Sequence, residues 1–263
     1  MKISIITATF NSSETLGDCI ASVNSQTYPA IEHIIIDGRS TDETPELVRS
    51  AAKRMPVIVS ECDEGTYDAF NKGIRLAGGD IIGFLHSDDT FGSSQAIQHI
   101  AEAFLRPANM SSGQYQVDVV YGDLVFVERR NVNKVVRYWV SCPFKPGLLE
   151  RGWMPPHPTV FMRREVYEKH GLFNTNLKCA ADYDYILRVF RDTSLNTCYL
   201  PEVITRMRMG GISTKGIRYI INKKLEDYRV LKNNQMPFPL WILLSKNISK
   251  IPQLIFRKIF KSF

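Results

Sequence analysis

The chain has 263 residues, of which 44% are hydrophobic and 23% are charged, and this composition excludes a disordered tail, a collagen-like fibre and a protein with many membrane spans. Residues 203–263 carry 13 Lys and Arg against two acids, a balance of +11, whereas residues 1–202 carry 20 against 25, a balance of −5. A basic segment on an acidic body favours a polyanionic partner such as nucleic acid, anionic lipid or a diphosphate ligand.

Cysteine usage and apolar runs indicate the compartment. The five cysteines are scattered, and none has a zinc-binding spacing, so we expect reduced thiols in a cytoplasmic protein. The first residues lack the pattern of a signal peptide. No apolar stretch reaches the roughly 18–20 residues of a spanning helix.

Strands and helices alternate in the first third of the chain. The apolar patterns predict strands over Lys2–Thr7, Glu32–Asp37, Val57–Ser60 and Ile81–Leu85, with a helix after each of the first three. Such alternation predicts βαβ units and a mainly parallel sheet.

The signal is weaker beyond residue 95. Strands are predicted over Val117–Tyr121, Leu124–Glu128 and Asn196–Leu200, and helices over Val166–His170 and Ala181–Arg191. Residues 129–158 contain several prolines and are predicted to be irregular. We see no repeat and no linker that would divide the chain.

Polar residues recur where the predicted strands end. Ligands of parallel sheets bind beyond the carboxyl ends of the strands. These ends carry Thr7–Asn11, Asp37, Glu61–Asp63 and Ser87–Asp89. Mg²⁺ and Mn²⁺ keep water and substrate phosphate as ligands, so the Asp88–Asp89 pair could hold a cation together with a diphosphate. The alternative is a solvated acidic turn.

The segment after the first strand has no phosphate-loop motif. GxxxxGK[ST] and GxGxxG are both absent, which disfavours a P-loop NTPase and a Rossmann dinucleotide site. The small residues and the ring of Thr7–Asn11 could instead receive a nucleobase. Asp37 could accept a hydrogen bond from the base or ribose, or it could cap a turn.

Three further positions each have a functional and a structural interpretation. Asp182 opens a helix, where it is either a general base or a favourable charge at the helix dipole. His157 lies between prolines and is either held at a site or structural. Residues 206–214 suit a mobile loop that closes over phosphates, or a basic strand followed by a turn.

Taken in order, several segments resemble family 2 glycosyltransferases of the GT-A fold, the inverting nucleotide-sugar enzymes of bacterial polysaccharide synthesis. The segments include SIITATFNSSETL, EHIIIDGRSTDET, SECDEGTYDAFNKGIRLAGGDIIGFLHSDD, PHPTVFMRREVYEKHGLF and AADYDYILRV. The resemblance implies an α/β, Rossmann-like, mixed and mainly parallel sheet flanked by helices. It implies a catalytic domain over 1–215, with a nucleotide-sugar half (1–92) and an acceptor half (93–215). A basic amphipathic helical segment would follow over 216–263.

The resemblance also implies roles for individual residues. Asp182 falls at the position of the catalytic base and Asp89 at that of the ligand for Mg²⁺ or Mn²⁺. The positions that match nucleotide-sugar binding are Thr7, Ala8, Phe10, Asp37, Asp63, Asn71, Lys72, Ser87 and Asp88. The acceptor side or lid would comprise His157, Arg208, Gly210, Gly211 and Ser213. Ser87 replaces the first acid of the family's DXD motif, and Phe10 stands where many relatives have Tyr.

The implied reaction moves a sugar from a nucleoside-diphosphate sugar, first of all a UDP-sugar, to a hydroxyl of a glycan or a lipid-diphosphate-linked acceptor. It would invert the anomeric centre and serve lipopolysaccharide or exopolysaccharide synthesis, with no nucleic-acid partner. The alternatives are a non-catalytic nucleotide-sugar-binding protein and a sugar nucleotidyltransferase. The second would need a Gly-rich phosphate loop after the first strand, which is absent.

The C-terminal segment has an amphipathic pattern. Apolar residues (Leu244, Ile248, Ile251, Ile255, Ile259) and basic residues (Lys246, Lys250, Arg257, Lys261) recur at spacings of three or four. Such a segment is typical of peripheral binding to an anionic membrane surface, here the cytoplasmic face of the inner membrane. The alternative is a helix that packs on the catalytic domain.

Overall fold

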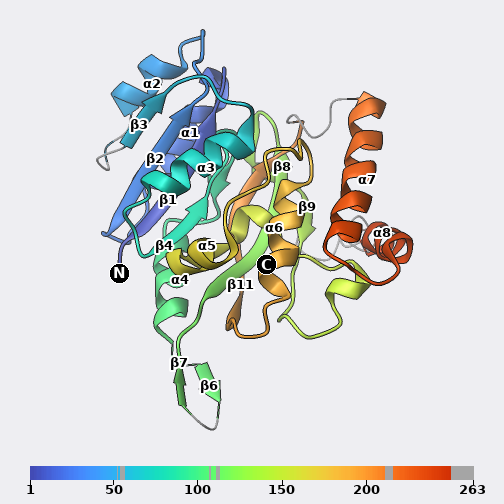
Figure 1. Ribbon diagram of the computed structural model, residues 1–263. Helices are drawn as coiled ribbons and strands as arrows, with labels where there is room; N and C mark the ends of the chain where they lie inside the picture. Colours follow the sequence, from blue (N-terminus) through green and yellow to red (C-terminus); the bar gives the residue numbers. More distant parts are fainter. Residues whose placement is uncertain (52, 54–56, 107, 111–112, 211–215, 250–263) are drawn as a thin grey trace.

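The computed structural model describes residues 1–51, 53, 57–106, 108–110, 113–210 and 216–249. Figure 1 shows a long twisted sheet with helices on both of its faces. Within the described residues the strand order is β3-β2-β1-β4-β10-β8-β11-β5, and β9 pairs with β8. The predicted α/β class, a mixed sheet flanked by helices, is confirmed.

The first half of the sheet is parallel and follows the predicted elements. These are β1 (Ile3–Thr9), α1 (Ser13–Asn24), β2 (Ile31–Asp37), α2 (Thr44–Ala51), β3 (Val57–Ser60), α3 (Thr66–Leu76) and β4 (Ile81–Phe84). Consecutive Ile residues are buried on both faces of β1 and β2, as expected for a parallel sheet covered by helices. The four carboxyl ends therefore meet at one edge.

The second half mixes parallel and antiparallel pairs. Its elements are β5 (Thr90–Phe91), α4 (Ala96–Leu105), β6 (Ala108–Met110), β7 (Gly113–Tyr115), β8 (Val119–Glu128), β9 (Asn131–Trp139), the short 3-10 helices η1 (Leu149–Arg151) and η2 (His157–Thr159), β10 (Phe161–Arg163), α5 (Arg164–His170), α6 (Ala181–Phe190) and β11 (Thr197–Arg208). β10 is antiparallel to β4 and β8, whereas β8 and β11 are parallel. β6 and β7 form a separate pair.

The prediction that residues 129–158 are irregular is wrong at its start. β9 forms an antiparallel hairpin with β8, in which Leu124 lies opposite Trp139. The side chains of β9 are half-buried or exposed along its whole length. A strand that is not buried on either face needs no apolar alternation, so residues 131–139 carry no periodic pattern that would predict it.

Two apolar clusters lie on opposite faces of the sheet. On one face α1 and α4 cover the sheet with residues such as Leu16, Ile20 and Ile97. On the other face α3, α5 and α6 pack with residues such as Phe70 and Ile186. This layering fixes the first turns of α3 and α6 beside the carboxyl edge of the sheet (Figure 1).

Two C-terminal helices pack beside α6. They are α7 (Gly216–Asn233) and α8 (Pro239–Ile248). Val230, Leu231 and Ile242 belong to the same core cluster as α6, so both helices are part of the folded body. Within the described part of the chain, we find no helix whose length and apolar character would let it cross a membrane.

Candidate active site

Asp37 ends β2 and holds the turn that follows. The strand register places Thr9, Asp37 and Ser60 side by side at the ends of β1, β2 and β3. The two carboxylate oxygens of Asp37 accept hydrogen bonds from Ser40 Oγ (2.5 Å) and Ser60 Oγ (2.6 Å), and the Ser40 N–H lies 3.2 Å from each. Asp37 is buried, so its carboxylate serves the turn, as the capping alternative predicts.

An exposed ring and a carboxylate meet at Gly38. Phe10 follows β1 and is 61% exposed. A Cβ atom on Gly38 would lie 3.4 Å from Phe10 Cδ2 and 2.7 Å from Asp63 Oδ2. Ala8, the neighbouring small residue of β1, is half-buried. The structure thus brings Phe10 and Asp63, two residues predicted to bind a nucleotide, to the same place.

The two carboxylates after β4 have different environments. Asp88 is half-exposed, and its carboxylate has no hydrogen-bond partner within the described residues. Asp89 is 1% exposed; its Oδ1 accepts a hydrogen bond from the Arg208 N–H (3.0 Å), and its Oδ2 is buried without a partner. Burial and the nearby charge of Asp88 raise the pKa of Asp89 well above its usual value. The preceding Ser87 Oγ lies 3.1 Å from Ser12 Oγ.

Arg208 lies in β11 and not on a lid loop, which corrects the prediction. It is 5% exposed, and its guanidinium donates to the backbone oxygens of Asp88 (2.8 Å) and Arg129 (3.0 Å) and pairs with Asp18. These bonds hold the Asp88–Asp89 turn from behind. Arg208 therefore supports the site and has no free face for phosphate.

The two described residues after β11, Met209 and Gly210, form a turn. Gly210 is exposed and has a φ of 93°, which favours glycine. Gly211 and Ser213, which were also predicted to form the lid, lie outside the described residues.

Asp182 lies in the first turn of α6. Its Oδ1 accepts a hydrogen bond from the Tyr67 hydroxyl (3.2 Å), which comes from the first turn of α3. Burial raises the pKa of Asp182, but the protonated form of His157 and the charges of Lys223 and Lys246 lower it by more, so the net pKa is below the usual value. An ionised carboxylate in this position can accept a proton from a bound hydroxyl.

A cluster of rings connects the Asp88 turn with Asp182. His157 stacks on Phe84 with ring centroids 5.5 Å apart, and the His86 ring lies 6.4 Å from that of His157. Burial lowers the pKa of His157 to about 4 and also lowers the pKa of His86. The Phe70 ring centroid lies 5.4 Å from that of His86 and 6.4 Å from that of Tyr67, the residue that donates to Asp182, so packed rings connect the Asp88 turn with Asp182.

Besides Asp37, three further predicted nucleotide-sugar residues have structural partners. Thr7 is wholly buried, and its hydroxyl bonds to His33 Nε2 (3.0 Å). The Asn71 amide exchanges two hydrogen bonds, each 2.9 Å, with the backbone of Phe173 and is likewise buried. Lys72 pairs with Glu61 (2.9 Å) and so braces the loop of Asp63.

The burial of one C-terminal lysine was not predicted from the sequence. Lys246 of α8 is 7% exposed, pairs with Asp227 of α7 (3.1 Å), and lies 3.4 Å from the centroid of the Tyr183 ring. It therefore does not belong to a solvated basic face, which corrects the prediction. The sequence feature that could have indicated its burial is its position within the largely apolar run of residues 240–248.

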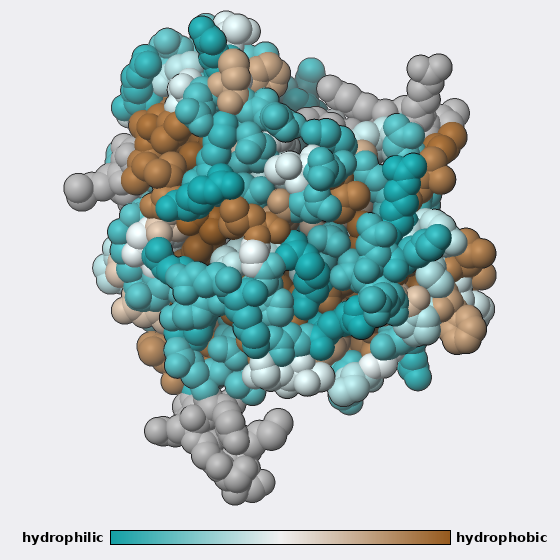
Figure 2. Space-filling model, in the orientation of Figure 1, coloured by the Kyte–Doolittle hydropathy of each residue, from teal (hydrophilic) through white to brown (hydrophobic). Residues whose placement is uncertain are grey.

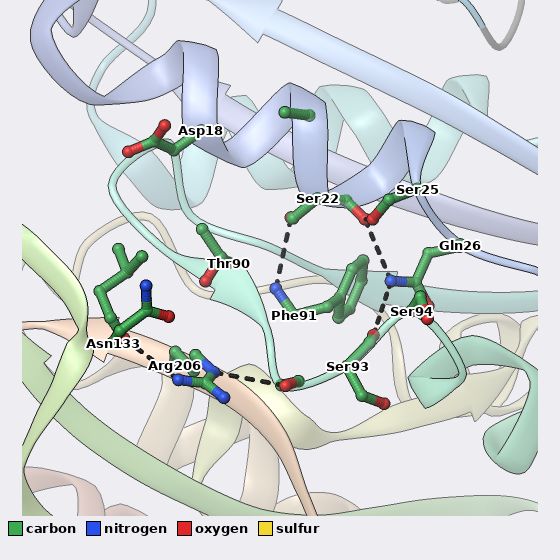
Figure 3. A pocket seen from close by; sticks show the side chains of 13 residues that line it. Asp18, Ser22, Ser25, Gln26, Thr90, Phe91, Ser93, Ser94, Asn133 and Arg206 are labelled. Carbon is green, nitrogen blue, oxygen red and sulfur yellow. Dashed lines mark hydrogen bonds between the residues drawn. The ribbon is translucent and has the colours of Figure 1, made fainter.

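A pocket of about 310 Å³ opens behind the Asp88–Asp89 turn, between α1, β5 and β9. Figure 3 shows Ser22, Gln26 and Arg206 bonded to the backbone around the pocket. Ser22 Oγ accepts from the Phe91 N–H, Gln26 donates to the Ser93 oxygen, and Arg206 donates to Gly92 and Val132 oxygens. The hydrogen bonds around this pocket link α1 to the sheet, and neither Asp88 nor Asp182 lines it.

Comparison with known proteins decides the family. A model described as "Glycosyl transferase family 2" matches residues 4–171. The chain belongs to this family. A PGL/p-HBAD biosynthesis glycosyltransferase of Mycobacterium tuberculosis is 31% identical to this family 2 glycosyltransferase over 214 residues, 80% of this chain and 78% of the relative.

Two solved structures show the same GT-A fold. Staphylococcus aureus TarS 1-349 in complex with UDP-GlcNAc matches with a TM-score of 0.66 and 16% identity, over 98% of this chain and 79% of that one. The mannosyltransferase PcManGT from Pyrobaculum calidifontis, in complex with GDP-Man and Mn²⁺, matches with a TM-score of 0.63 and 18% identity, over 97% and 72%.

The Asp88–Asp89 turn fits a cation that is shared with a substrate. Among the described residues no group of three His, Cys, Asp or Glu side chains could hold a metal alone. Mg²⁺ keeps several waters and binds through one or two carboxylates plus substrate phosphates. The half-exposed Asp88 carboxylate and the unpartnered Asp89 Oδ2 provide oxygen ligands of that kind.

Proposed function

We propose that this family 2 glycosyltransferase transfers a sugar from a nucleoside-diphosphate sugar to a hydroxyl of a glycan or lipid-linked saccharide, with inversion. The observation that carries the proposal is a chain of contacts between the two carboxylates. Tyr67 donates to Asp182 and packs on Phe70, and Phe70 packs on His86, two residues before Asp88. One carboxylate is accessible at the sheet edge, and the other is ionised at a helix start. The nucleotide sugars bound to TarS and PcManGT support such a donor.

Asp182 is the proposed general base. The acceptor oxygen attacks the anomeric carbon, its proton passes to Asp182, and the bond from that carbon to the diphosphate oxygen breaks. Tyr67 donates to Asp182 Oδ1 and so fixes the carboxylate, which leaves Oδ2 for the proton. A single displacement from the face opposite the leaving group inverts the anomeric centre.

Asp88, rather than Asp89, is the proposed main ligand of a divalent cation, Mg²⁺ or Mn²⁺. The cation supplies positive charge that stabilises the departing diphosphate. Asp88 is accessible, whereas one Asp89 oxygen is bonded to the Arg208 N–H and the other is buried. We therefore assign Asp89 mainly to fixing the turn.

A membrane-bound acceptor is part of the proposal. Apolar side chains gather at the edge formed by α7 and α8 in Figure 2. On and just before α8 they are more than half exposed, and they comprise Phe238, Leu240, Trp241, Leu244 and Ile248. Together with the charge of +11 over residues 203–263, they suit an anionic membrane surface. At the cytoplasmic face of such a membrane, the enzyme would reach a lipid-diphosphate-linked acceptor of cell-surface polysaccharide synthesis.

The test is donor turnover by the full chain. UDP-Glc, UDP-GlcNAc, UDP-Gal and GDP-Man are each mixed with lipid-linked saccharides, with and without Mn²⁺, and nucleoside diphosphate and product are measured. We expect one donor to give both, and the anomeric configuration of the product to be opposite to that of the donor. Binding without any turnover would favour the non-catalytic alternative, and absence of all nucleotide binding would contradict the proposal.

A further inference from the structure

Two polar side chains of the 310 Å³ pocket between α1, β5 and β9 have hydrogen-bonding capacity that the fold leaves open. Thr90 is only 7% exposed, yet its hydroxyl makes no hydrogen bond to any described residue. Arg206 uses Nε and Nη1 for backbone oxygens, and no described residue accepts from its Nη2. Figure 3 shows both side chains around the same space as Asp18 and Asn133. Since polar groups buried as deeply as Thr90 are normally hydrogen-bonded, its hydroxyl is available to a bound molecule.

Asp18 and Asn133 complete the polar lining of the pocket. Asp18 is 60% exposed; its Oδ2 pairs with Arg208, and its Oδ1 accepts no hydrogen bond in the described part of the chain. The Asn133 side chain is exposed, and only its backbone N–H is bonded, to Asn131. The four open groups come from α1, β5, β9 and β11, so only the folded sheet brings them together.

The charges of this lining favour a neutral ligand. Asp18 is negative and Arg206 is positive, so a phosphate would meet one like charge and an ammonium group the other. A carboxylate only accepts hydrogen bonds and a guanidinium only donates them, whereas hydroxyl and amide groups do both. The hydroxyls of a sugar can donate to the first and accept from the second. Ala21 and Val132 line the same pocket and can contact the C–H groups of a sugar ring.

We propose that this pocket binds a neutral saccharide at a place separate from the transfer site. Its volume lies at the lower end of the range for small-molecule sites, roughly 300–1,000 Å³. Neither Asp88 nor Asp182 lines it. A glycan held there would stay close to the enzyme, because a second binding site raises its effective concentration at the first. That role, unlike the binding itself, rests on the proposed function.

The experiment measures the binding of maltose, cellobiose, mannobiose and N,N′-diacetylchitobiose to the full chain by ligand-observed NMR, without donor or metal. The wild type should bind at least one of them. Thr90→Val keeps the shape of the buried side chain and removes its hydroxyl, and Asn133→Ala removes the amide. Each should weaken binding about twofold to tenfold, the usual range for a neutral hydrogen bond. The control Lys134→Ala changes the next residue of β9, which does not line the pocket, and should bind like the wild type.

Ala21→Trp tests the location without relying on single hydrogen bonds. Ala21 is exposed on α1 and lines the pocket, so an indole can fill the cavity without entering the core. Disaccharide binding should be lost, whereas UDP should still bind in the presence of Mn²⁺.

Three outcomes would overturn the saccharide site. They are disaccharide binding that survives Ala21→Trp, tighter binding of inorganic phosphate than of any disaccharide, and no disaccharide binding by the wild type. A wild type that binds disaccharides but no nucleotide would instead contradict the proposed function and leave the saccharide site supported.

Discussion

Asp182 has a pKa that its neighbours lower, and this predicts a pH effect. Replacing Lys223 by Met removes one of the positive charges, so the pKa of Asp182 should rise. A base with a higher pKa is protonated at a higher pH, and the acid limb of the kcat profile should therefore move upward. Lys224→Met is the matched control on the same helix. Identical profiles for the two variants and the wild type would argue against electrostatic tuning.

Removing the base itself should separate binding from chemistry. Asp182→Asn keeps the size of the side chain and can still accept a hydrogen bond from Tyr67, but it cannot take a proton. Turnover should fall by about 10²–10⁴-fold, the usual contribution of a general base. The affinity for UDP should stay within a factor of about two, because the variant and the wild type present the same donor site. A loss of affinity with unchanged turnover would contradict the role.

The two acidic neighbours should respond differently to the same substitution. Asp88→Asn should abolish the gain in UDP affinity on addition of Mn²⁺, because it removes the accessible carboxylate. Asp89→Asn should keep that gain and much of the turnover, because the amide oxygen can still accept from the Arg208 N–H. Calorimetry of UDP binding with and without Mn²⁺ measures this gain in both variants. If Asp89→Asn lost the gain and Asp88→Asn kept it, Asp89 would be the main ligand.

At the scale of elements, hydrophobic periodicity identified the parallel half of the sheet. It failed where the secondary structure depends on pairing between distant parts of the chain. Ile-rich strands buried on both faces are visible in sequence, so β1 to β4 were predicted within about two residues, the usual uncertainty of element ends. β9 was missed because it is half-exposed. The burial of Lys246 and Arg208 was missed because their partners, Asp227 and Asp18, lie on other elements and only the fold brings them together.

The packing of α7 and α8 on α6 predicts that Lys246 stabilises the fold. Lys246→Met would leave Asp227 buried without its counter-charge, which typically costs about 3–5 kcal/mol. The double variant Lys246→Met, Asp227→Leu should recover part of this loss. Urea unfolding measures both, with the exposed Lys232→Met as control. Equal stability of Lys246→Met and the control would show that the pair contributes little.

For the whole molecule, the membrane proposal is best tested by substitution. Truncation before α8 would remove Ile242 and Lys246 from the interior, so it would disturb the fold as well. The triple variant Leu240→Ser, Trp241→Ser, Leu244→Ser changes exposed side chains only. It should float less with anionic vesicles than the wild type, at low and at high salt, because apolar insertion is lost.

A matched control uses apolar residues that are exposed elsewhere. Leu76→Ser with Leu105→Ser lies on α3 and α4, away from α7 and α8, and should float like the wild type. The remaining binding of the triple variant should weaken with salt, since it depends on charge alone. Equal flotation of all three proteins would contradict binding through α8.

Arg208 also has a consequence for the order in which the molecule is built. Its partners lie 119 residues earlier at Asp89 and 190 residues earlier at Asp18. Contacts between such distant parts of a chain form late, because each requires the closure of a long loop. A ribosome releases β11 only after β1 to β4 have emerged. The nascent chain can therefore pair these parallel strands first, and the Asp88–Asp89 turn gains its support from Arg208 only when synthesis is nearly finished.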